Sequence, residues 1–251
     1  YLSNMLTDQQ FFDYGWRIPF LLSSVLIVIG LYVRLSISET PEFEANKKKN
    51  KALAIPFMTV FKEHGKPLFL GTFIALATFV LFYLMTVFIA SWAITDLHMT
   101  RELFLENQII SVFFFALLIP ISALLADRYG RKRILMTASL FIIIFGALLG
   151  YLLGSSDSVS ILITLSIGMA LMGFTYGPLG TILSELYPTN VRYTGSSLSF
   201  NLAGIVGASF APFIALWLSS TYGISYVGYY LALAALISLV SIKLSCKAKA
   251  G

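Results

Sequence analysis

The stretch from Leu68 to Ala93, LFLGTFIALATFVLFYLMTVFIASWA, contains no Asp, Glu, Lys, Arg or His. A helix of this length is long enough to cross a hydrocarbon core of about 30 Å, because each helical residue rises about 1.5 Å. Its apolar residues follow one another without the alternation that a membrane barrel strand requires. The stretch therefore predicts a membrane-spanning helix.

Six further stretches have the same character. They run from Trp16 to Leu35, Glu106 to Ala126, Ile134 to Leu153, Ser160 to Leu183, Thr194 to Leu218 and Val227 to Ser245. The seven stretches together predict an all-α integral membrane protein with seven transmembrane helices.

Composition gives the same class of protein. Hydrophobic residues make up 58% of the 251, charged residues 12%, and the mean hydropathy is +0.85. A soluble domain carries about twice that charged fraction, so we expect lipid as the main partner and no nucleic acid. The single cysteine, Cys246, excludes a disulfide within the chain and is interpreted as a spectator rather than a redox or lipidation site.

The basic residues predict the orientation in the membrane. Of the 17 Lys and Arg residues, 15 fall on one side of the predicted spans, and only Arg17 and Arg101 fall on the other. The basic side should be cytoplasmic, which places the linker 36–67, the segment 127–133 and the C-terminus inside the cell. In the linker, Thr40-Pro41-Glu42 is typical of a helix start.

A second linker helix is predicted from Pro56 to Gly65. Phe57, Val60, Phe61 and His64 have the spacing of one helical face, which favours a helix on the inner membrane surface. His64 is interpreted as an interfacial residue, because no metal-ligand spacing surrounds it.

Small residues at helical spacing indicate close helix packing. Gly146, Gly150 and Gly154 are four residues apart, as are Gly173 and Gly177. Pro120, Pro178 and Pro212 could instead bend helices near a substrate path. Packing is the preferred interpretation for all of them.

The connection between the third and fourth spans reads DRYGRKR, from Asp127 to Arg133. An acid at a helix end, a glycine that allows a tight turn and several bases could form an ionic latch. Simple topological anchoring by positive charge is the other interpretation.

This segment resembles the loop signature of the major facilitator superfamily, with Ala123 in place of the usual leading glycine. Asp13–Phe20, Glu39–Phe43 and Glu185–Gly195 resemble segments of its metabolite:proton symporter family, which carries proline or betaine, shikimate, citrate and α-ketoglutarate. The resemblance covers essentially the whole chain.

By this resemblance the spans are helices six to twelve of a twelve-helix carrier. Residues 1–35 would end the first half, 36–67 would be the central linker and 68–251 the second six-helix bundle. Tyr1 is not an initiator and no signal peptide follows it, so helices one to five are expected as a further partner.

The resemblance also implies two sets of site residues. The cytoplasmic charge cluster, expected to gate the carrier, is Asp127, Arg128, Gly130, Arg131, Glu185 and Arg192. The wall of the substrate cavity is expected to include Tyr83, Thr86, Ser111, Tyr176 and Asn201, although helix–helix hydrogen bonding is the preferred interpretation for each residue taken separately.

The function implied is secondary active transport of a small polar metabolite across the bacterial inner membrane, not an enzymatic reaction. Driven by a proton gradient and without a cofactor, it would proceed by alternating access. The ionisable residues lie near span ends, so the coupling group is expected outside this chain. The alternatives are a non-transporting fragment and a seven-helix photoreceptor; Lys243 at a helix end argues against the latter.

Overall fold

The computed structural model describes residues 7–36, 56–154 and 157–247, and every regular element in these ranges is helical. Seven helical segments are long and apolar enough to cross a membrane, as the sequence predicted. The chain divides into two units, Tyr1–Ala52 and Leu53–Gly251. The predicted helix start at Thr40-Pro41-Glu42 lies outside the described residues.

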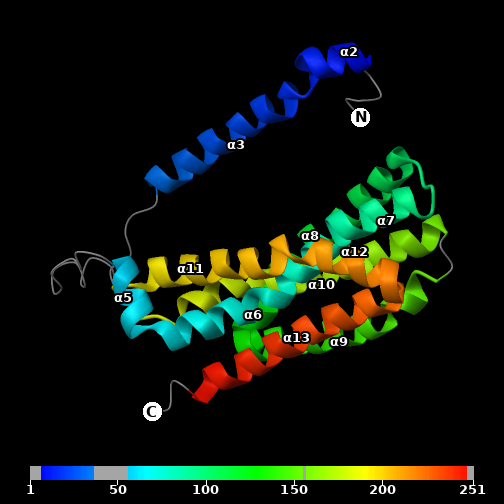
Figure 1. Cartoon of the computed structure of the whole chain (residues 1–251). Helices are drawn as coiled ribbons and strands as arrows, with labels where there is room; N and C mark the ends of the chain where they lie inside the picture. Colours follow the sequence, from blue (N-terminus) through cyan, green and yellow to red (C-terminus); the bar gives the residue numbers. More distant parts are fainter. Residues whose placement is uncertain (1–6, 37–55, 155–156, 248–251) are drawn as a thin grey trace. The chain divides into compact units, whose positions relative to one another are not determined.

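The described part of the first unit, residues 7–36, contains one long helix. A short α2 (Asp8–Gln10) and a π-helical turn, η1 (Phe11–Gly15), precede α3 (Arg17–Ser36), drawn in blue in Figure 1. The segment Phe12–Val33 is the first candidate span, which begins before the predicted Trp16.

The second unit contains the other six candidate spans. Its elements are α5 (Pro56–Glu63), α6 (Gly65–Tyr83), η2 (Leu84–Phe88), α7 (Ile89–Thr95), α8 (Arg101–Tyr129), α9 (Arg131–Leu152), α10 (Ser158–Ser184), α11 (Arg192–Gly204), η3 (Ile205–Ser209), α12 (Ala211–Tyr222) and α13 (Ile224–Lys247). In Figure 1 the long helices of this unit run roughly along one direction, with α5 at the end where α6 and α11 begin.

Most of the helices extend beyond the predicted apolar stretches at one or both ends. The largest difference is at α8, which begins at Arg101 rather than at Glu106. The hydroxyl of Thr100 accepts a hydrogen bond from the backbone N–H of Leu103, and Glu102 lies in the first turn. Capping and an acid at a helix N-terminus stabilise helical residues whatever their hydropathy, so a hydropathy argument misses them.

Two spans contain π-helical turns that the sequence analysis did not predict. In the second span η2 separates α6 from α7, and in the sixth span η3 separates α11 from α12. Pro212 lies in the first turn of α12, directly after η3. Pro120 and Pro178 lie inside α8 and α10.

Glycines let pairs of helices approach until their backbones touch. A Cβ atom on Gly146 of α9 would overlap the carbonyl oxygen of Gly228 in α13, and a Cβ atom on Gly150 would overlap Ser225. Gly177 of α10 meets Ser122 and the Ile119 carbonyl of α8 in the same way. The preferred packing interpretation is confirmed at these positions. Gly154, by contrast, is near only its own helix.

The short helix α5 forms over Pro56–Glu63, where the sequence predicted a helix. Val60 is fully buried against Leu68, Tyr187 and Val191. Phe57 and Phe61 pair with each other, with ring centroids 5.0 Å apart, and both are about half exposed. The position of this helix on the inner membrane surface stays a prediction, with Phe57 and Phe61 as the side chains that would face lipid.

Candidate functional site

The turn between α8 and α9 positions the charges of the DRYGRKR segment. Gly130 ends α8 with φ of 97° and ψ of 129°, a conformation that L side chains rarely adopt. Its N–H closes the last turn of α8 by donating to the carbonyl of Ala126 at 2.9 Å. Because α9 begins at the next residue, Asp127 and Arg131 come to lie on either side of the turn.

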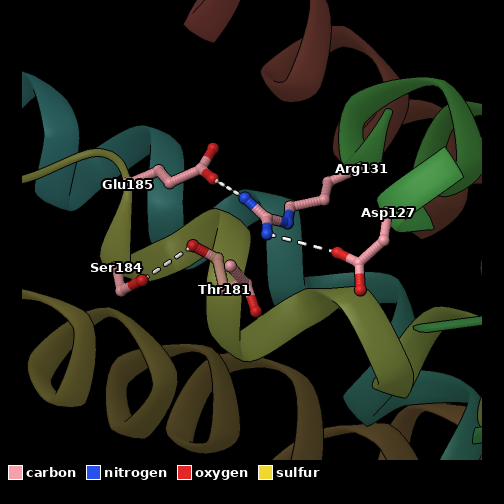
Figure 2. Close-up of polar contacts among 5 residues, drawn as sticks. All are labelled: Asp127, Arg131, Thr181, Ser184 and Glu185. Atoms are coloured by element: carbon pink, nitrogen blue, oxygen red, sulfur yellow. Dashed lines mark hydrogen bonds and ion pairs between the residues drawn. The ribbon is translucent and has the colours of Figure 1, made fainter. Parts of the chain in front are cut away.

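Arg131 lies between two carboxylates. Figure 2 shows its guanidinium group bonded to Glu185 on one side and to Asp127 on the other. The Arg131 Nη2 to Asp127 Oδ1 distance is 3.3 Å, and Nη1 donates to Oε1 of Glu185. The Asp127 side chain is 68% exposed and that of Glu185 34%, so the pair with Asp127 contributes at most about 1 kcal/mol to stability.

Ion pairs thus join three of the six residues predicted for the charge cluster, and Gly130 forms the turn that positions them. Arg128 instead lies over the ring of Tyr129, 5.3 Å from its centroid. Arg192 donates from Nε to the carbonyl of Tyr187 at 3.4 Å, and no ion pair is found for it within the described residues. A cavity of about 680 Å³ is lined by the segment Ala126–Arg133 and by Glu185.

The predicted cavity residue Tyr176 lines a second cavity, of about 400 Å³, between α8, α10 and α11. Tyr176 is 40% exposed, and its ring makes an edge contact with Phe115, at 5.8 Å between centroids. The rest of the lining is mostly apolar or glycine: Ile119, Gly177, Leu179, Gly180, Thr181 and Phe200. The hydroxyls of Tyr176 and Thr181 are the polar side-chain groups among these residues.

The other predicted cavity residues do not line this cavity. Asn201 is exposed next to Phe200, and its side-chain amide donates to the carbonyl of Ser197 at 2.8 Å. Tyr83 is partly buried beside Phe82, and Thr86 donates to the Phe82 carbonyl in its own helix. Ser111 is fully buried and donates to the carbonyl of Gln108.

Two aromatic residues were missed by the sequence analysis. Phe200 lines the same cavity as Tyr176, and its ring contacts Phe79 of α6 at 4.9 Å between centroids. Tyr187 lies between α10 and α11 but is only 3% exposed. Burial raises the pKa of Tyr187 above 10, although its hydrogen bond with Ser199 acts in the opposite direction. In the sequence analysis, Tyr187 was included only as part of the segment Glu185–Gly195.

Within the described ranges, no three His, Cys, Asp or Glu side chains lie close enough together to hold a metal ion. His64 contacts the Tyr187 ring instead, at 6.3 Å between ring centroids.

Within the described residues, seven helices are long and apolar enough to cross a membrane. A charged turn joins α8 to α9, and a cavity lies between α8, α10 and α11. These are features of a membrane protein that crosses the bilayer several times. Residues 10–207 match the model of the Major Facilitator Superfamily, and the chain belongs to that family. No solved structure matches the chain.

The relatives are carriers of the kinds that the motifs indicated. The chain is 44% identical, over 97% of its length, to the inner membrane metabolite transport protein YhjE of Escherichia coli (strain K12), of which it covers 57%. It is 31% identical to the shikimate transporter of the same organism and covers 56% of it. For the proline/betaine transporter the identity is 26% and the coverage 50%. The chain therefore spans about half the length of these relatives.

Proposed function

We propose that this chain forms the second six-helix half, and the last helix of the first half, of a secondary active transporter for a small polar metabolite. Membership of the superfamily supports this function, as do relatives named as metabolite, shikimate and proline/betaine transporters. Carriers of this superfamily move two related halves against each other around a site at the interface. The span of about half of each relative agrees with such a division.

The observation that carries the proposal is the cavity at Tyr176. It opens between α8, α10 and α11, it is about 400 Å³ in volume, and it combines two hydroxyl groups with apolar walls. A site of this kind can hold the uncharged part of an organic acid, an amino-acid-like molecule or a betaine. On this proposal the wall of the substrate path includes Tyr176 and Phe200, with Asn201 beside it.

A proton gradient is proposed as the driving force, with no cofactor. Among the described residues, Asp, Glu, Lys, Arg and His occur only near the ends of the candidate spans. Proton coupling needs a titratable group within the membrane. We therefore place that group in helices one to five, since the relatives are nearly twice as long as this chain and have room for further helices.

Transport by a twelve-helix carrier that contains this chain tests the substrate wall. In proteoliposomes with an imposed proton gradient, uptake should be measured for shikimate, proline, glycine betaine and α-ketoglutarate. Tyr176→Ala should raise the apparent KM for the transported compound by about tenfold, as loss of a direct substrate contact would. Tyr151→Ala is the matched control, because Tyr151 on α9 is 85% exposed. Equal KM values in both variants would remove Tyr176 from the substrate path.

The alternative is a chain that assembles with other membrane proteins but does not itself transport. The 251-residue chain reconstituted alone should show no gradient-dependent uptake, because it offers one wall of a cavity with no opposite half. Saturable uptake by this chain alone would contradict the division into halves. Failure of the twelve-helix carrier with every compound of the panel would favour the assembly role.

The Arg131 contacts are proposed to close the cytoplasmic side of the carrier. In the twelve-helix protein, Asp127→Asn should slow transport by at least about tenfold at an unchanged protein level. The assignment of the cytoplasmic side has its own test: a cysteine at Lys62 should be unreactive toward an impermeant thiol reagent in intact cells. Labelling of that cysteine from outside would reverse the proposed topology.

A further inference from the structure

The segment between α10 and α11 is held at one residue, Tyr187. Its hydroxyl lies 2.6 Å from Oγ of Ser199, which is two turns into α11. Its ring lies flat against Gly195, where a Cβ atom would overlap three ring atoms. Both ends of the segment are thereby tied to α11, since a buried hydroxyl pair is costly to separate.

Ser199 connects the same contact to α6. It is fully buried, and a Cβ atom on Gly71 of α6 would overlap its side chain. Neither glycine can be replaced without moving Tyr187 or Ser199. The closeness of these atoms means that α6, α11 and the Tyr187 segment shift together or not at all.

The linker helix α5 also contacts Tyr187. Val60 of α5 is fully buried in a cluster with Leu68, Tyr187 and Val191. His64 follows α5 directly, and its ring meets the edge of the Tyr187 ring. Because α5 is the last part of the linker 36–67, its contact with Tyr187 connects that linker to the bundle.

Glu185 stands only two residues before Tyr187. It is the C-cap of α10, and its carboxylate is bound to Arg131. The N–H of Tyr187 donates to the carbonyl of Ser184 at 3.3 Å, and Arg192 binds the Tyr187 carbonyl. The position of Tyr187 therefore sets where the Glu185 carboxylate can reach.

We propose that Tyr187 is a positioning residue that couples the linker helix α5 to the Arg131–Glu185 ion pair. Release of α5 from the bundle then frees Glu185, and loss of the ion pair loosens α5. The coupling rests on these contacts and not on the transport function, so it is testable in the chain itself.

The test measures how fast a water-soluble carbodiimide modifies Glu185 in the purified 251-residue chain, with Glu102 as internal reference. Glu102 is exposed at the start of α8, far along the chain from Tyr187. Val60→Asn should speed modification of Glu185 at least about twofold, the lower range of measured couplings between sites. Phe61→Asn is the matched control, because Phe61 is the next residue of α5 and is 45% exposed.

The role of Tyr187 in this coupling is tested by repeating the Val60→Asn and Phe61→Asn substitutions in a chain that carries Tyr187→Ala. Tyr187→Ala alone should speed modification of Glu185, and in that background Val60→Asn should add nothing. Tyr187→Phe keeps the ring, removes the hydroxyl and serves if the alanine variant does not fold, as judged by circular dichroism and gel filtration. Equal Glu185 rates in Val60→Asn and Phe61→Asn would overturn the coupling. An undiminished effect of Val60→Asn without the Tyr187 ring would overturn the role of Tyr187.

Discussion

The spans that contain α6 and α8 are similarly apolar, but they differ in what covers them. In Gly65–Thr95, 61% of the most apolar window is buried inside the chain, whereas in Arg101–Tyr129 the share is 17%. Lipid tails are as apolar as leucine, so hydrophobicity alone does not drive one helix into the interior of a membrane protein. The difference must come from small and hydroxyl side chains.

The residue types of the two helices bear this out. On α6 the buried positions include Gly71, Thr72, Ala75, Ala77 and Thr78. The buried residues of α8 are fewer, and long apolar side chains such as Phe113 and Leu124 are exposed. Helix α6 is therefore the centre of the second unit, while α8 keeps a face free for lipid or for another part of a carrier.

The largest expected effect comes from the same substitution on both helices. Leu81→Ala on α6 should lower the free energy of unfolding by about 2 kcal/mol, because Leu81 is fully buried and its removal leaves a cavity. Leu124→Ala on α8 should change it by less than about 0.5 kcal/mol, because Leu124 is 71% exposed. Unfolding in detergent by an added denaturing surfactant measures both. Equal losses would mean that α8 is covered as fully as α6.

The comparison also separates what the sequence could predict from what it could not. The seven spans and their order could be predicted from continuous apolar runs, because the surrounding lipid requires these runs whatever the contacts between helices are. The contact of Gly146 with Gly228 brings together residues 82 positions apart, so only the spacing within α9 was predictable. The π-turns η2 and η3 have no signal in hydropathy, since apolar residues continue through them.

The candidate site shows the same division. Asp127, Gly130 and Arg131 are adjacent in sequence, and one turn is enough to place them. Arg192 was expected in that cluster from the motif resemblance and from its side of the membrane, criteria too coarse to distinguish Glu185 from the Tyr187 carbonyl as its partner. The role of Tyr187 depends on its contacts with Ser199, 12 residues on, and with α5, which lies far from it in sequence.

A second prediction sharpens the account of how α6 is held. The hydroxyls of Thr78 on α6 and Thr175 on α10 are 3.0 Å apart, and both side chains are buried. A double-mutant cycle with Thr78→Val and Thr175→Val should give a coupling of about 0.6 kcal/mol, typical of hydrogen bonds between membrane helices. Additive losses in the surfactant unfolding assay would show that the two hydroxyls do not stabilise each other.

A smaller effect is expected at the exposed end of α8. Asp127→Asn should change the free energy of unfolding by less than about 0.5 kcal/mol, because the Asp127 carboxylate is largely in water. Any loss should shrink further in 0.5 M salt, which screens exposed charges. A stability loss of several kcal/mol, independent of salt, would mean that this end of α8 is buried in the same way as α6. In that case, slow transport by the Asp127→Asn variant would reflect its lost stability and would give no evidence for a gating role.

The smallest effect is a loss of stability that begins only in alkali. It concerns the end of the unit where α6 begins, where Tyr187 is 3% exposed, in contrast to Tyr129 at the end of α8, which is half exposed. Burial raises the pKa of Tyr187 in the folded chain above its ordinary value of 10. The folded state therefore holds this proton more tightly than the unfolded state does. The stability that this difference contributes is complete below pH 10 and is lost as the pH rises through the raised pKa.

Absorbance of the tyrosinate anion during an alkaline titration, together with unfolding at each pH, measures the effect. Tyr187→Phe should remove a late-ionising part of the absorbance change and should flatten the fall of stability above pH 10. Tyr193→Phe is the control for the loss of one phenol, because Tyr193 lies in the first turn of α11 and is 86% exposed. If the two variants titrate alike, the phenol of Tyr187 reaches water as freely as that of Tyr193. The contact between Tyr187 and Ser199 would then be open in solution, and this end of α6 would be as exposed as the end of α8 at Tyr129.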